Sequence, residues 1–360
     1  EAQGADVLLF DAGDFSQGTT LVNHSKGLAA AEYLAAAGYD AVTFGNHEFD
    51  FTFDALKDNA EILQAGGVQT LAANIVKKNT STPYFGDRTT FEAGGMKIGV
   101  FGLDTAETQT KAAPSNVKDV TFLDGEEMFE VAQQQIDALK AEGCDYIIAL
   151  THLGVDDESI GRRSYDLANA VTGLDLIIDG HSHTVMDGGE VVNDILIVST
   201  GSYLSNIGTV VVDENGTTAK LISCADVNTM LNGEVDADVA ALVAEDKATV
   251  DAYYSGIFAK TEVDLDGNKD PGVRTMETNL GDFSADAYLY AGKKYAQEHE
   301  MDLNVVGAIA NGGGIRASIP AGDISMNTLY TVFPYGNTLA LVTISGAELL
   351  EVLEASTFCT

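Results

Sequence analysis

Lysine and arginine are scarce in this chain. Its 360 residues include 19 Lys and Arg against 55 Asp and Glu, so the formal net charge is −36 at pH 7, and the acidic residues are scattered along the sequence. A protein that binds the nucleic-acid backbone is expected to present a basic face, which argues against a nucleic-acid duplex as a partner. We interpret the acidity mainly as a source of solubility. An anionic substrate would then need a local cation, and bound metal is the natural candidate.

Long apolar runs and patterned cysteines are also missing. No run approaches the ~20 residues that a membrane-spanning helix needs, so we expect a soluble protein with no transmembrane segment in the given sequence. Cys144, Cys224 and Cys359 stand far apart and match no zinc-finger or redox spacing, so they indicate neither a redox compartment nor a disulfide state. No signal peptide is visible, but the first residue is not Met, which makes that absence uninformative.

The order of apolar runs and helical stretches predicts an α/β protein. The chain is long enough for two domains. Its first half alternates short apolar runs with helical stretches, which predicts βαβ units and a largely parallel sheet. Further along, β-branched runs at 195–199, 207–212 and 217–222 predict antiparallel strands of a second sheet. Near the end we expect helices and strands in a second βα region, with strands at 304–310, 329–333 and 339–344.

Four apolar runs of the first half each end in a polar cluster. The clusters are 11–18, 45–50, 151–154 and 179–184. Because the carboxyl ends of neighbouring parallel strands meet at one crevice, their side chains are expected to converge. The residues concerned are Asp14, Asn46, His47, Asp50, His152, His181 and His183.

Carboxylate, amide and imidazole groups together suit zinc or manganese better than calcium. Taken one at a time, each residue has an ordinary structural role. A lone Asp after a strand often caps a helix, and a lone His is often a satisfied core residue. Their joint occurrence at four strand ends is what favours a metal site.

The order of these motifs resembles that of a known family. The segments 13–18, 45–48, 151–152 and 180–183 are similar to successive signature blocks of the calcineurin-like metallophosphoesterases. The block Asn-His-Glu-Phe-Asp at 46–50, with 311–316 and Phe-Pro-Tyr-Gly at 333–336, narrows the resemblance to the 5′-nucleotidase family. That family includes UDP-sugar hydrolases and 2′,3′-cyclic-nucleotide phosphodiesterases. The resemblance covers nearly the whole chain.

This resemblance implies a fold and a division into domains. Residues 1–227 would form a calcineurin-like metallophosphoesterase domain, a four-layer α/β/β/α sandwich. Residues 228–258 would form a linker helix, and 259–360 a smaller C-terminal α/β domain that recognises the substrate. An Asp-x-His motif on a first strand is expected before Glu1, so we expect a sequence truncated at both ends that is metal-poor or inactive as given.

The resemblance also implies a centre of two divalent metal ions, with zinc or manganese expected. The implied ligands are Asp14, which would bridge the ions, with Asn46, His152 and His181 at one ion and His183 at the other. Such a two-metal clamp polarises phosphoryl oxygens and supplies a hydroxide for in-line attack.

His47 and Asp50 resemble the catalytic dyad of the family. An imidazolium at His47 would stabilise charge on the leaving group, and Asp50 would hold it charged and oriented. Glu48 and Phe49 have no chemistry assigned to them, and we expect them to hold the loop.

The resemblance places substrate contacts in the second domain. Asn311 and Arg316 occupy positions where the family contacts substrate, and Gly313 belongs to a triple glycine that permits close backbone approach. Arg316 is one of few cations available to pair with phosphate. Tyr335 matches an aromatic residue that stacks on the base. Lys294 is a weaker candidate for a second phosphate contact, because its alignment rests on helix register alone.

The resulting hypothesis is a secreted, cell-surface or periplasmic bacterial phosphohydrolase that acts on nucleotides such as 5′-monophosphates. Alternatives within the same scaffold are a 2′,3′-cyclic-nucleotide phosphodiesterase, a UDP-sugar hydrolase or a thiosulfohydrolase. An alternative of another class is a catalytically silent surface module that binds nucleotides or a host partner. The sequence indicates neither the base preference nor the oligomeric state.

Overall fold

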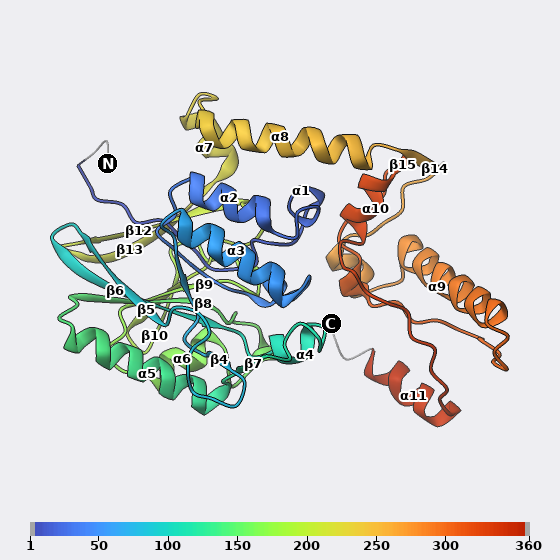
Figure 1. The fold of residues 1–360 in the computed structure, drawn as a ribbon, viewed down its shortest axis with the longest axis horizontal. Helices are drawn as coiled ribbons and strands as arrows, with labels where there is room; N and C mark the ends of the chain where they lie inside the picture. Colours follow the sequence, from blue (N-terminus) through green and yellow to red (C-terminus); the bar gives the residue numbers. More distant parts are fainter. Residues whose placement is uncertain (1–3, 357–360) are drawn as a thin grey trace. The chain divides into compact units, whose positions relative to one another are not determined.

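The computed structural model describes residues 4–356, and the chain divides into two compact units. Unit 1 comprises the residues up to Gln17 together with Val22–Asp246, and unit 2 comprises Gly18–Leu21 and the residues from Lys247 onward. Helix α8 (Ala237–Tyr254), labelled in Figure 1, lies within the predicted linker helix of 228–258 and contains the point of division between Asp246 and Lys247. In the described part of the chain, no helix combines the length and the apolar character needed to cross a membrane. Cys359 lies outside the described residues.

Unit 1 contains two main sheets. The first is parallel, with strand order β1-β2-β3, and comprises β1 (Phe10–Asp11), β2 (Ala41–Thr43) and β3 (Gln69–Leu71). The second has the order β10-β11-β9-β8-β6-β5 and comprises β10 (Glu190–Val192), β11 (Ile195–Val198), β9 (Leu176–Asp179), β8 (Tyr146–His152), β6 (Met96–Asp104) and β5 (Arg88–Ala93). Its four inner strands are parallel, and the two edge strands are antiparallel to their neighbours.

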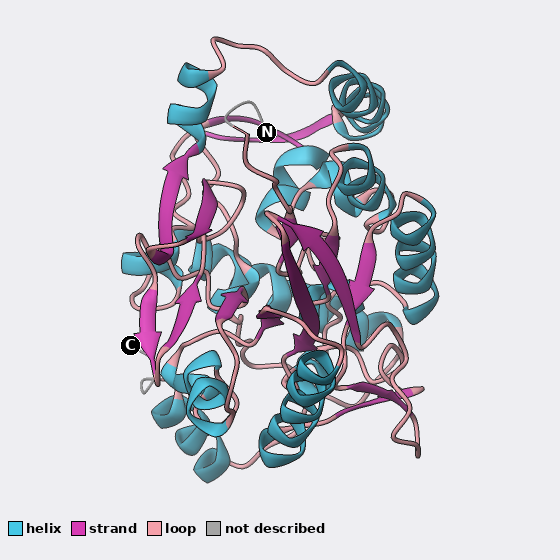
Figure 2. Cartoon of the chain, turned by 90° about the vertical axis from the view of Figure 1, so that its left-hand side faces the viewer, coloured by secondary structure: helices cyan, strands magenta, loops and turns pink. Residues whose placement is uncertain are grey.

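Helices cover the outer faces of both sheets. Helices α2 (Leu28–Ala36) and α3 (Phe53–Ala65) pack on the first sheet, and α5 (Gly125–Ala141) and α6 (Ser164–Ala170) pack on the second. A third apolar cluster, which includes Ala41 and Leu71 from one sheet and Val100, Ile148 and Leu150 from the other, fills the space between the sheets. In Figure 1, α2 and α3 lie on one side of the strands of the two main sheets and α5 and α6 on the other, and Figure 2 shows the strands with helices beside them from a second direction. The layers are therefore α/β/β/α.

Local sequence explains where these helices begin and which face they bury. The Thr52 hydroxyl accepts a hydrogen bond from Ala55 N at the start of α3, and the Asp124 carboxylate accepts one from Gly125 N at the start of α5. Both are caps of backbone donors that the helix leaves unpaired. The buried apolar residues of α5 run from Met128 to Leu139 at spacings of three and four, so one stripe of the helix faces the sheet.

Helix α1 (Thr20–Asn23) contains the boundary between Leu21 of unit 2 and Val22 of unit 1. Smaller elements complete unit 1. They are η1 (Asn46–Phe49), β4 (Ile75–Lys77), α4 (Thr108–Lys111), β7 (Val120–Phe122), η2 (Asp157–Ser159), β12 (Asn206–Asp213), β13 (Gly216–Ser223) and α7 (Cys224–Met230). The predicted antiparallel hairpin of 207–212 and 217–222 is confirmed as β12–β13.

Residues 195–199 were predicted to form an antiparallel strand of a second sheet, and the predicted direction is wrong for the main neighbour of this strand. Strand β11 pairs in parallel with β9, with Leu196 opposite Leu176, and is antiparallel only to the short strand β10. Asn193 and Asp194, both with positive φ (50° and 64°), make the tight turn between β10 and β11. Such turns suit hairpins, and this one reverses the chain so that β11 re-enters the sheet parallel to β9.

Unit 2 is built around a small apolar core. Strands β14 (Ile257–Thr261) and β15 (Gly322–Ser325) are antiparallel, and the core consists of Leu280, Ile315, Ile319, Ile324 and Val332. The other elements are η3 (Lys269–Val273), α9 (Asn279–Glu298), η4 (Gly312–Gly314), α10 (Met326–Val332) and α11 (Gly346–Ala355).

Three predicted strands of unit 2 are wrong. Residues 304–310 and 339–344 are not strands, and most of 329–333 belongs to helix α10. The Ser325 hydroxyl accepts a hydrogen bond from Thr328 N, and the Thr328 hydroxyl accepts one from Ser325 N. This reciprocal cap starts a helix in a segment whose β-branched and aromatic residues favour a strand.

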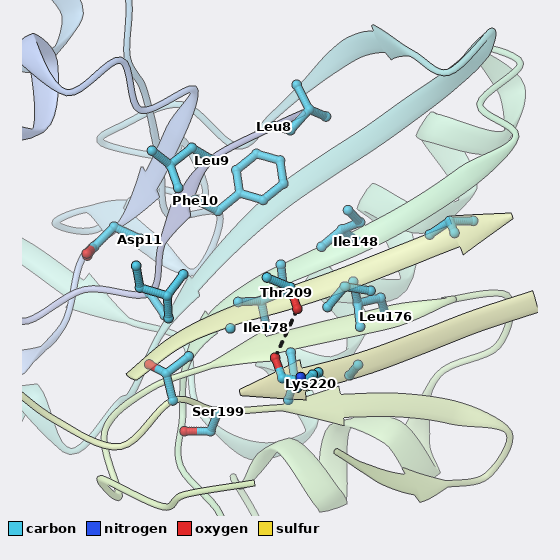
Figure 3. Close-up of a pocket in the computed structure, with 18 of the residues that line it drawn as sticks. Leu8, Leu9, Phe10, Asp11, Ile148, Leu176, Ile178, Ser199, Thr209 and Lys220 are labelled. Atoms are coloured by element: carbon cyan, nitrogen blue, oxygen red, sulfur yellow. Dashed lines mark hydrogen bonds between the residues drawn. The ribbon is translucent and has the colours of Figure 1, made fainter. Parts of the chain in front are cut away.

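An apolar cavity of about 320 Å³ lies between the layers of unit 1. Figure 3 shows Leu8 and Phe10 on one side of it and Ile148, Leu176 and Ile178 on the other. Its lining is dominated by aliphatic side chains, and the residues predicted to bind metal are not among them. The cavity is therefore distinct from the cluster of polar residues described next.

Candidate active site

Three strand ends of unit 1 bring Asp14, Asn46 and His152 together. Asp14 follows β1 with a φ of 65°, Asn46 is the first residue of η1 just after β2, and His152 is the last residue of β8. The backbone N–H of His47 donates to Asp14 Oδ1 at 2.9 Å, which joins the first two loops. Asn46 and His152 are 8% and 1% exposed, so this polar group is buried.

The ring of His152 is held between a carbonyl and a carboxylate. Its Nδ1 donates to Ala12 O at 2.6 Å, and its Nε2 lies 3.0 Å from Asp14 Oδ2. A carbonyl oxygen only accepts, so Nδ1 carries a proton, and Nε2 is the ring nitrogen that faces the carboxylate. Burial lowers the pKa of His152, but the charge of Asp14 outweighs this and raises it to about 10. The site therefore attracts a positive charge between the two side chains.

Among the described residues, Oδ1 of Asn46 is buried and accepts no hydrogen bond. Nε2 of His152 is also buried, and it faces the Asp14 carboxylate at 3.0 Å. A buried acceptor without a partner costs about 1–3 kcal/mol, so a folded protein rarely keeps one beside a carboxylate without a purpose. Both atoms are ligand atoms of divalent transition metals.

Three glycines form a cradle around the His152 ring. A Cβ at Gly45 would lie 2.4 Å from Asp14 Oδ1 and 2.6 Å from His152 Nε2. A Cβ at Gly13 would lie 3.0 Å from His152 Nδ1, and one at Gly180 would lie 2.8 Å from the same atom. No larger residue fits at Gly45 or Gly180 without displacing the site, which explains why glycine precedes the polar residue in these loops.

Glu48 ties the first two loops to each other. Its carboxylate accepts hydrogen bonds from the backbone N–H groups of Gly45 (2.6 Å), Asp14 (2.8 Å) and Ser16 (3.0 Å). Burial raises the pKa of Glu48 to about 7, with a further contribution from the charge of Asp14. Phe49 is fully buried in an apolar cluster of unit 1. The expectation that Glu48 and Phe49 hold the loop is confirmed.

His47 and Asp50 form a close pair at the edge of the same loop. His47 Nδ1 lies 2.6 Å from Asp50 Oδ2, and each side chain is 22% exposed. Burial lowers the pKa of His47, but the charge of Asp14 and the hydrogen bond with Asp50 together raise it above its ordinary value. The arrangement favours an imidazolium that remains accessible from solvent.

His181 and His183 follow β9 in left-handed backbone conformations, with φ of 70° and 57°. The His181 ring lies edge-on to the His152 ring, with centroids 5.1 Å apart. Its Nε2 is 3.2 Å from Glu107 Oε2. The structure thus brings His181 to the cluster of Asp14 and His152 and turns one of its nitrogens toward a carboxylate.

The residues present fit one divalent ion. Within residues 4–356 no group of three or more His, Cys, Asp and Glu side chains is gathered closely enough to hold a metal. Asp14 and His152 nevertheless face each other, and a third ligand atom comes from the amide of Asn46. The unpartnered Asn46 Oδ1 and the facing groups of Asp14 and His152 carry this conclusion. A second ion bound by His183 stays a prediction.

Sequence reasoning missed three acidic residues beside this site. Asp104 ends β6 directly opposite His152 in β8, and burial raises its pKa well above the usual value. Burial also raises the pKa of Asp11, at the end of β1, to about 6. Glu107 contacts His181. The same rule that found the other residues, a polar group just after an apolar strand, points to Asp104.

Four of the five predicted substrate residues lie together in unit 2. Asn311 Oδ1 accepts a hydrogen bond from Gly313 N at 3.2 Å, and Arg316 Nη1 donates to Gly313 O at 3.4 Å. The Arg316 guanidinium lies 5.6 Å from the ring centroid of Tyr335. Lys294 lies apart on the exposed face of α9, with Nζ 3.8 Å from Glu298 Oε1.

Arg274 is a further cation at the glycine turn. A Cβ at Gly312 would lie 2.2 Å from Val273 O, so the turn packs against the end of η3. A Cβ at Gly313 would lie 3.5 Å from Arg274 Nη2. The turn is therefore flanked by two guanidinium groups, those of Arg274 and Arg316. No periodicity or spacing in the sequence marks Arg274.

Comparison with known proteins decides the family. Residues 257–359 match the family model described as 5′-nucleotidase, C-terminal domain, and residues 8–206 match the model described as bacterial capsule synthesis protein PGA_cap. The trifunctional nucleotide phosphoesterase protein YfkN of Bacillus subtilis is 33% identical over 386 residues, which cover 96% of this chain and 25% of YfkN. The snake venom 5′-nucleotidase of Crotalus adamanteus is 30% identical, with 99% of this chain and 62% of the venom protein covered. The chain belongs to the 5′-nucleotidase family.

Its N-terminal region, more than half of the chain, also belongs to the domain family described as PGA_cap. The relatives that span both regions are named as nucleotide phosphoesterases and 5′-nucleotidases, which are hydrolases of phosphoric esters. The chain spans a quarter of YfkN and less than two thirds of the venom enzyme. The calcineurin-like phosphoesterase and 5′-nucleotidase families are metal-dependent.

Solved structures confirm the predicted fold class. The 5′-nucleotidase precursor from Thermus thermophilus has a TM-score of 0.75 and 28% identity, and the similarity covers 99% of this chain and 70% of that one. The calcineurin-like phosphoesterase YfkN from Bacillus subtilis has a TM-score of 0.56 and 22% identity, covering 68% of this chain and 84% of that one. The α/β/β/α sandwich followed by a smaller domain is therefore a fold of this family.

Proposed function

We propose that this protein is a metal-dependent phosphohydrolase of the 5′-nucleotidase type, which releases phosphate from nucleotides. The observation that carries the proposal is the buried Asn46 Oδ1, which accepts no hydrogen bond from the described residues, together with the Asp14 carboxylate and His152 Nε2 facing each other at 3.0 Å. Such a set attracts a divalent cation, and the names of the relatives supply the substrate class.

The proposed centre holds two divalent ions, zinc or manganese. Asp14 would be a ligand of both ions, Asn46, His152 and His181 would hold one of them, and His183 would hold the other. Bound ions would supply Lewis-acid polarisation of the phosphoryl group and would activate the attacking water at neutral pH. The protein itself supplies the placement of the ligands, through Glu48, the glycine cradle and the Ala12 carbonyl.

His47 is the proposed cation beside the reacting phosphoryl group. Its Nδ1 faces Asp50 at 2.6 Å, so the proton on that nitrogen is held and the ring keeps one orientation. The raised pKa of His47 favours the imidazolium. A charged donor at this position stabilises negative charge that develops on the leaving oxygen.

Unit 2 is proposed to recognise the nucleotide. Arg316 would pair with phosphate, Tyr335 would stack on the base, and Asn311 and Gly313 would contact the substrate from the glycine turn. Lys294 remains a weaker candidate for a second phosphate contact, since it lies 3.8 Å from Glu298 on α9. We propose that the protein acts outside the cytoplasm, secreted, at the cell surface or in the periplasm, because one relative is named as a venom enzyme.

The test is phosphate release from three substrates in parallel. The purified intact protein is incubated with Mn²⁺ or Zn²⁺ and AMP, UDP-glucose or 2′,3′-cyclic AMP, with chelated protein as the control. We expect metal-dependent phosphate release from AMP. Hydrolysis of only UDP-glucose or the cyclic nucleotide would replace the proposed substrate with one of those alternatives. AMP binding without hydrolysis of any substrate would mean a silent binding module and would overturn the proposal.

A further inference from the structure

Glu107 connects three loops next to the proposed metal centre. It immediately precedes α4 and is 9% exposed. Its Oε1 accepts a hydrogen bond from the Ser159 hydroxyl at 2.7 Å, and its Oε2 lies 2.5 Å from Lys111 Nζ. The same Oε2 is 3.2 Å from His181 Nε2. A nearly buried carboxylate with three different partners is held in one position.

These contacts decide which nitrogen of His181 carries the proton. A carboxylate beside a lysine ammonium is ionised and can only accept hydrogen bonds. The hydrogen of the contact between Glu107 and His181 therefore belongs to Nε2 of the ring. A neutral imidazole has one N–H and one lone pair, so the lone pair of His181 is on Nδ1.

The backbone fixes the same ring from its other sides. His181 has a φ of 70°, a conformation that few residues other than glycine adopt. A Cβ at Gly154 would lie 3.2 Å from His181 Cδ2, so the glycine lets the ring approach that loop closely. The His152 ring packs against it edge-on, with centroids 5.1 Å apart. Rotation of the ring is therefore restricted.

We propose that Glu107 is a positioning residue, which holds His181 in the Nε2–H tautomer and so leaves Nδ1 as the nitrogen that binds the metal ion. This inference rests on the proposed function, because it takes His181 as a metal ligand. Histidine ligands of metals commonly donate their second N–H to a carboxylate, which orients the ring and raises its basicity. Lys111 and Ser159 contact the Glu107 carboxylate and hold it in place.

The tautomer is measured first, in chelated protein, by ¹⁵N NMR of the histidine rings. The His181 signals are assigned by their loss in His181→Gln. We expect Nε2 to be protonated and Nδ1 to be unprotonated in the wild type, and a mixture of tautomers in Glu107→Leu. A wild-type ring protonated on Nδ1 would overturn the proposal without reference to metal or activity.

Metal affinity is measured second, by calorimetric titration with Mn²⁺. Loss of an outer-shell partner typically weakens metal binding by about 10–100-fold, which we expect for Glu107→Leu. Glu107→Gln, whose amide oxygen can accept the same N–H, should retain most of the affinity. Glu127→Leu is the matched control, because it makes the same substitution at an exposed glutamate of α5, outside the contacts of Glu107. Equal affinity in the wild type and Glu107→Leu would contradict the proposal.

The two measurements separate this inference from the proposed function. If the wild type binds Mn²⁺ and Glu107→Leu binds it equally well, the inference fails and the proposed function stands. If the wild type shows the expected tautomer but binds no metal, the proposed function fails, and with it the role of Glu107. If Glu107→Leu does not fold, the inference is still tested by the tautomer of His181 in the wild type and by the Mn²⁺ affinity of Glu107→Gln.

Discussion

Nε2 of His152 lies 3.0 Å from Oδ2 of Asp14, while Nδ1 of the same ring donates to the Ala12 carbonyl at 2.6 Å. The carbonyl fixes a proton on the far nitrogen, so Nε2 is the nitrogen that faces the carboxylate across a buried gap. A divalent cation between the two groups would take the place of the positive charge that this pair otherwise holds as a proton. The glycines at 13, 45 and 180 provide the room that the arrangement requires.

Gly45→Ala should disrupt the site much more than an ordinary glycine substitution. The added Cβ would lie 2.4 Å from Asp14 Oδ1 and 2.6 Å from His152 Nε2. The φ of Gly45 is −115°, so the backbone itself tolerates alanine. Overpacking of this kind lowers the free energy of unfolding by about 1–3 kcal/mol. We also expect Gly45→Ala to lose Mn²⁺ binding. Thermal unfolding with and without metal measures both effects.

Gly256→Ala is the matched control, because a Cβ at Gly256 meets nothing within 4 Å and its φ is not in the left-handed region. It should leave metal-induced stabilisation unchanged. Equal metal-induced stabilisation of Gly45→Ala and the wild type would show that the close contacts at Gly45 do not belong to a metal centre.

The raised pKa of Glu48 predicts that the free energy of unfolding of the chelated protein depends on pH. Burial raises its pKa in the folded state to about 7 from an ordinary value of 4.5. A raised carboxyl pKa contributes stability that is fully present below the unfolded pKa and is lost as the pH rises through the folded pKa. The free energy of unfolding should therefore fall between about pH 4.5 and 7, by at most ~1.4 kcal/mol per pH unit from this group.

Urea unfolding of wild type, Glu48→Gln and Glu190→Gln across this pH range checks the prediction. Glu48→Gln should flatten the decline, because it removes the titrating carboxyl. Glu190, exposed at the edge strand β10, serves as the control and should leave the decline in place. An unchanged slope in Glu48→Gln would assign the pH dependence to other groups.

His47→Ala should separate catalysis from metal binding. The side chain pairs with Asp50, and its backbone N–H, which the substitution retains, is what contacts Asp14. Loss of a positioned acid or cation typically lowers the rate by about 10²–10⁴-fold, so we expect kcat for AMP to fall by this factor with Mn²⁺ affinity preserved. His299→Ala, at the end of α9, is the control and should match the wild type. Loss of metal from His47→Ala would assign His47 to the metal site instead.

Arg316→Met should raise KM for AMP more than it changes kcat. The guanidinium lies 5.6 Å from the Tyr335 ring centroid and donates to Gly313 O. A hydrogen bond to a charged group contributes about 1.5–3 kcal/mol, which corresponds to a rise in KM of roughly 10–100-fold. Lys260→Met, on strand β14 of the same unit, controls for a general loss of charge. Equal KM values for both variants would remove Arg316 from the substrate site.

Most of the candidate site residues were predicted from one rule, that polar clusters at the carboxyl ends of parallel strands lie close together. Asp14, Asn46, His152 and His181 come from four different segments, and parallel strands bring their carboxyl ends to one edge of the fold. The rule uses only the alternation of apolar runs and polar clusters in the sequence, so it can be applied without knowing the order of the strands in the sheets.

Contacts that depend on short or irregular segments escaped prediction. Glu107 reaches His181 from the turn before α4, and no periodic pattern marks that turn. Strand β10 has only 3 residues, so the reversal that makes β11 parallel to β9 was not visible. In α10 the cap formed by Ser325 and Thr328 outweighed the β-branched composition of the segment.

The most direct test of the metal centre is a calorimetric titration of chelated wild type and Asn46→Leu with Mn²⁺. Asn46 Oδ1 is buried without a partner, so its removal should leave the chelated protein as stable as before or up to about 1–3 kcal/mol more stable. Metal binding, in contrast, should weaken by at least about tenfold, because a ligand atom is lost. Saturable binding in the wild type that is lost in a stable Asn46→Leu is the predicted result. Identical titrations of the two proteins would contradict a metal centre at Asp14, Asn46 and His152.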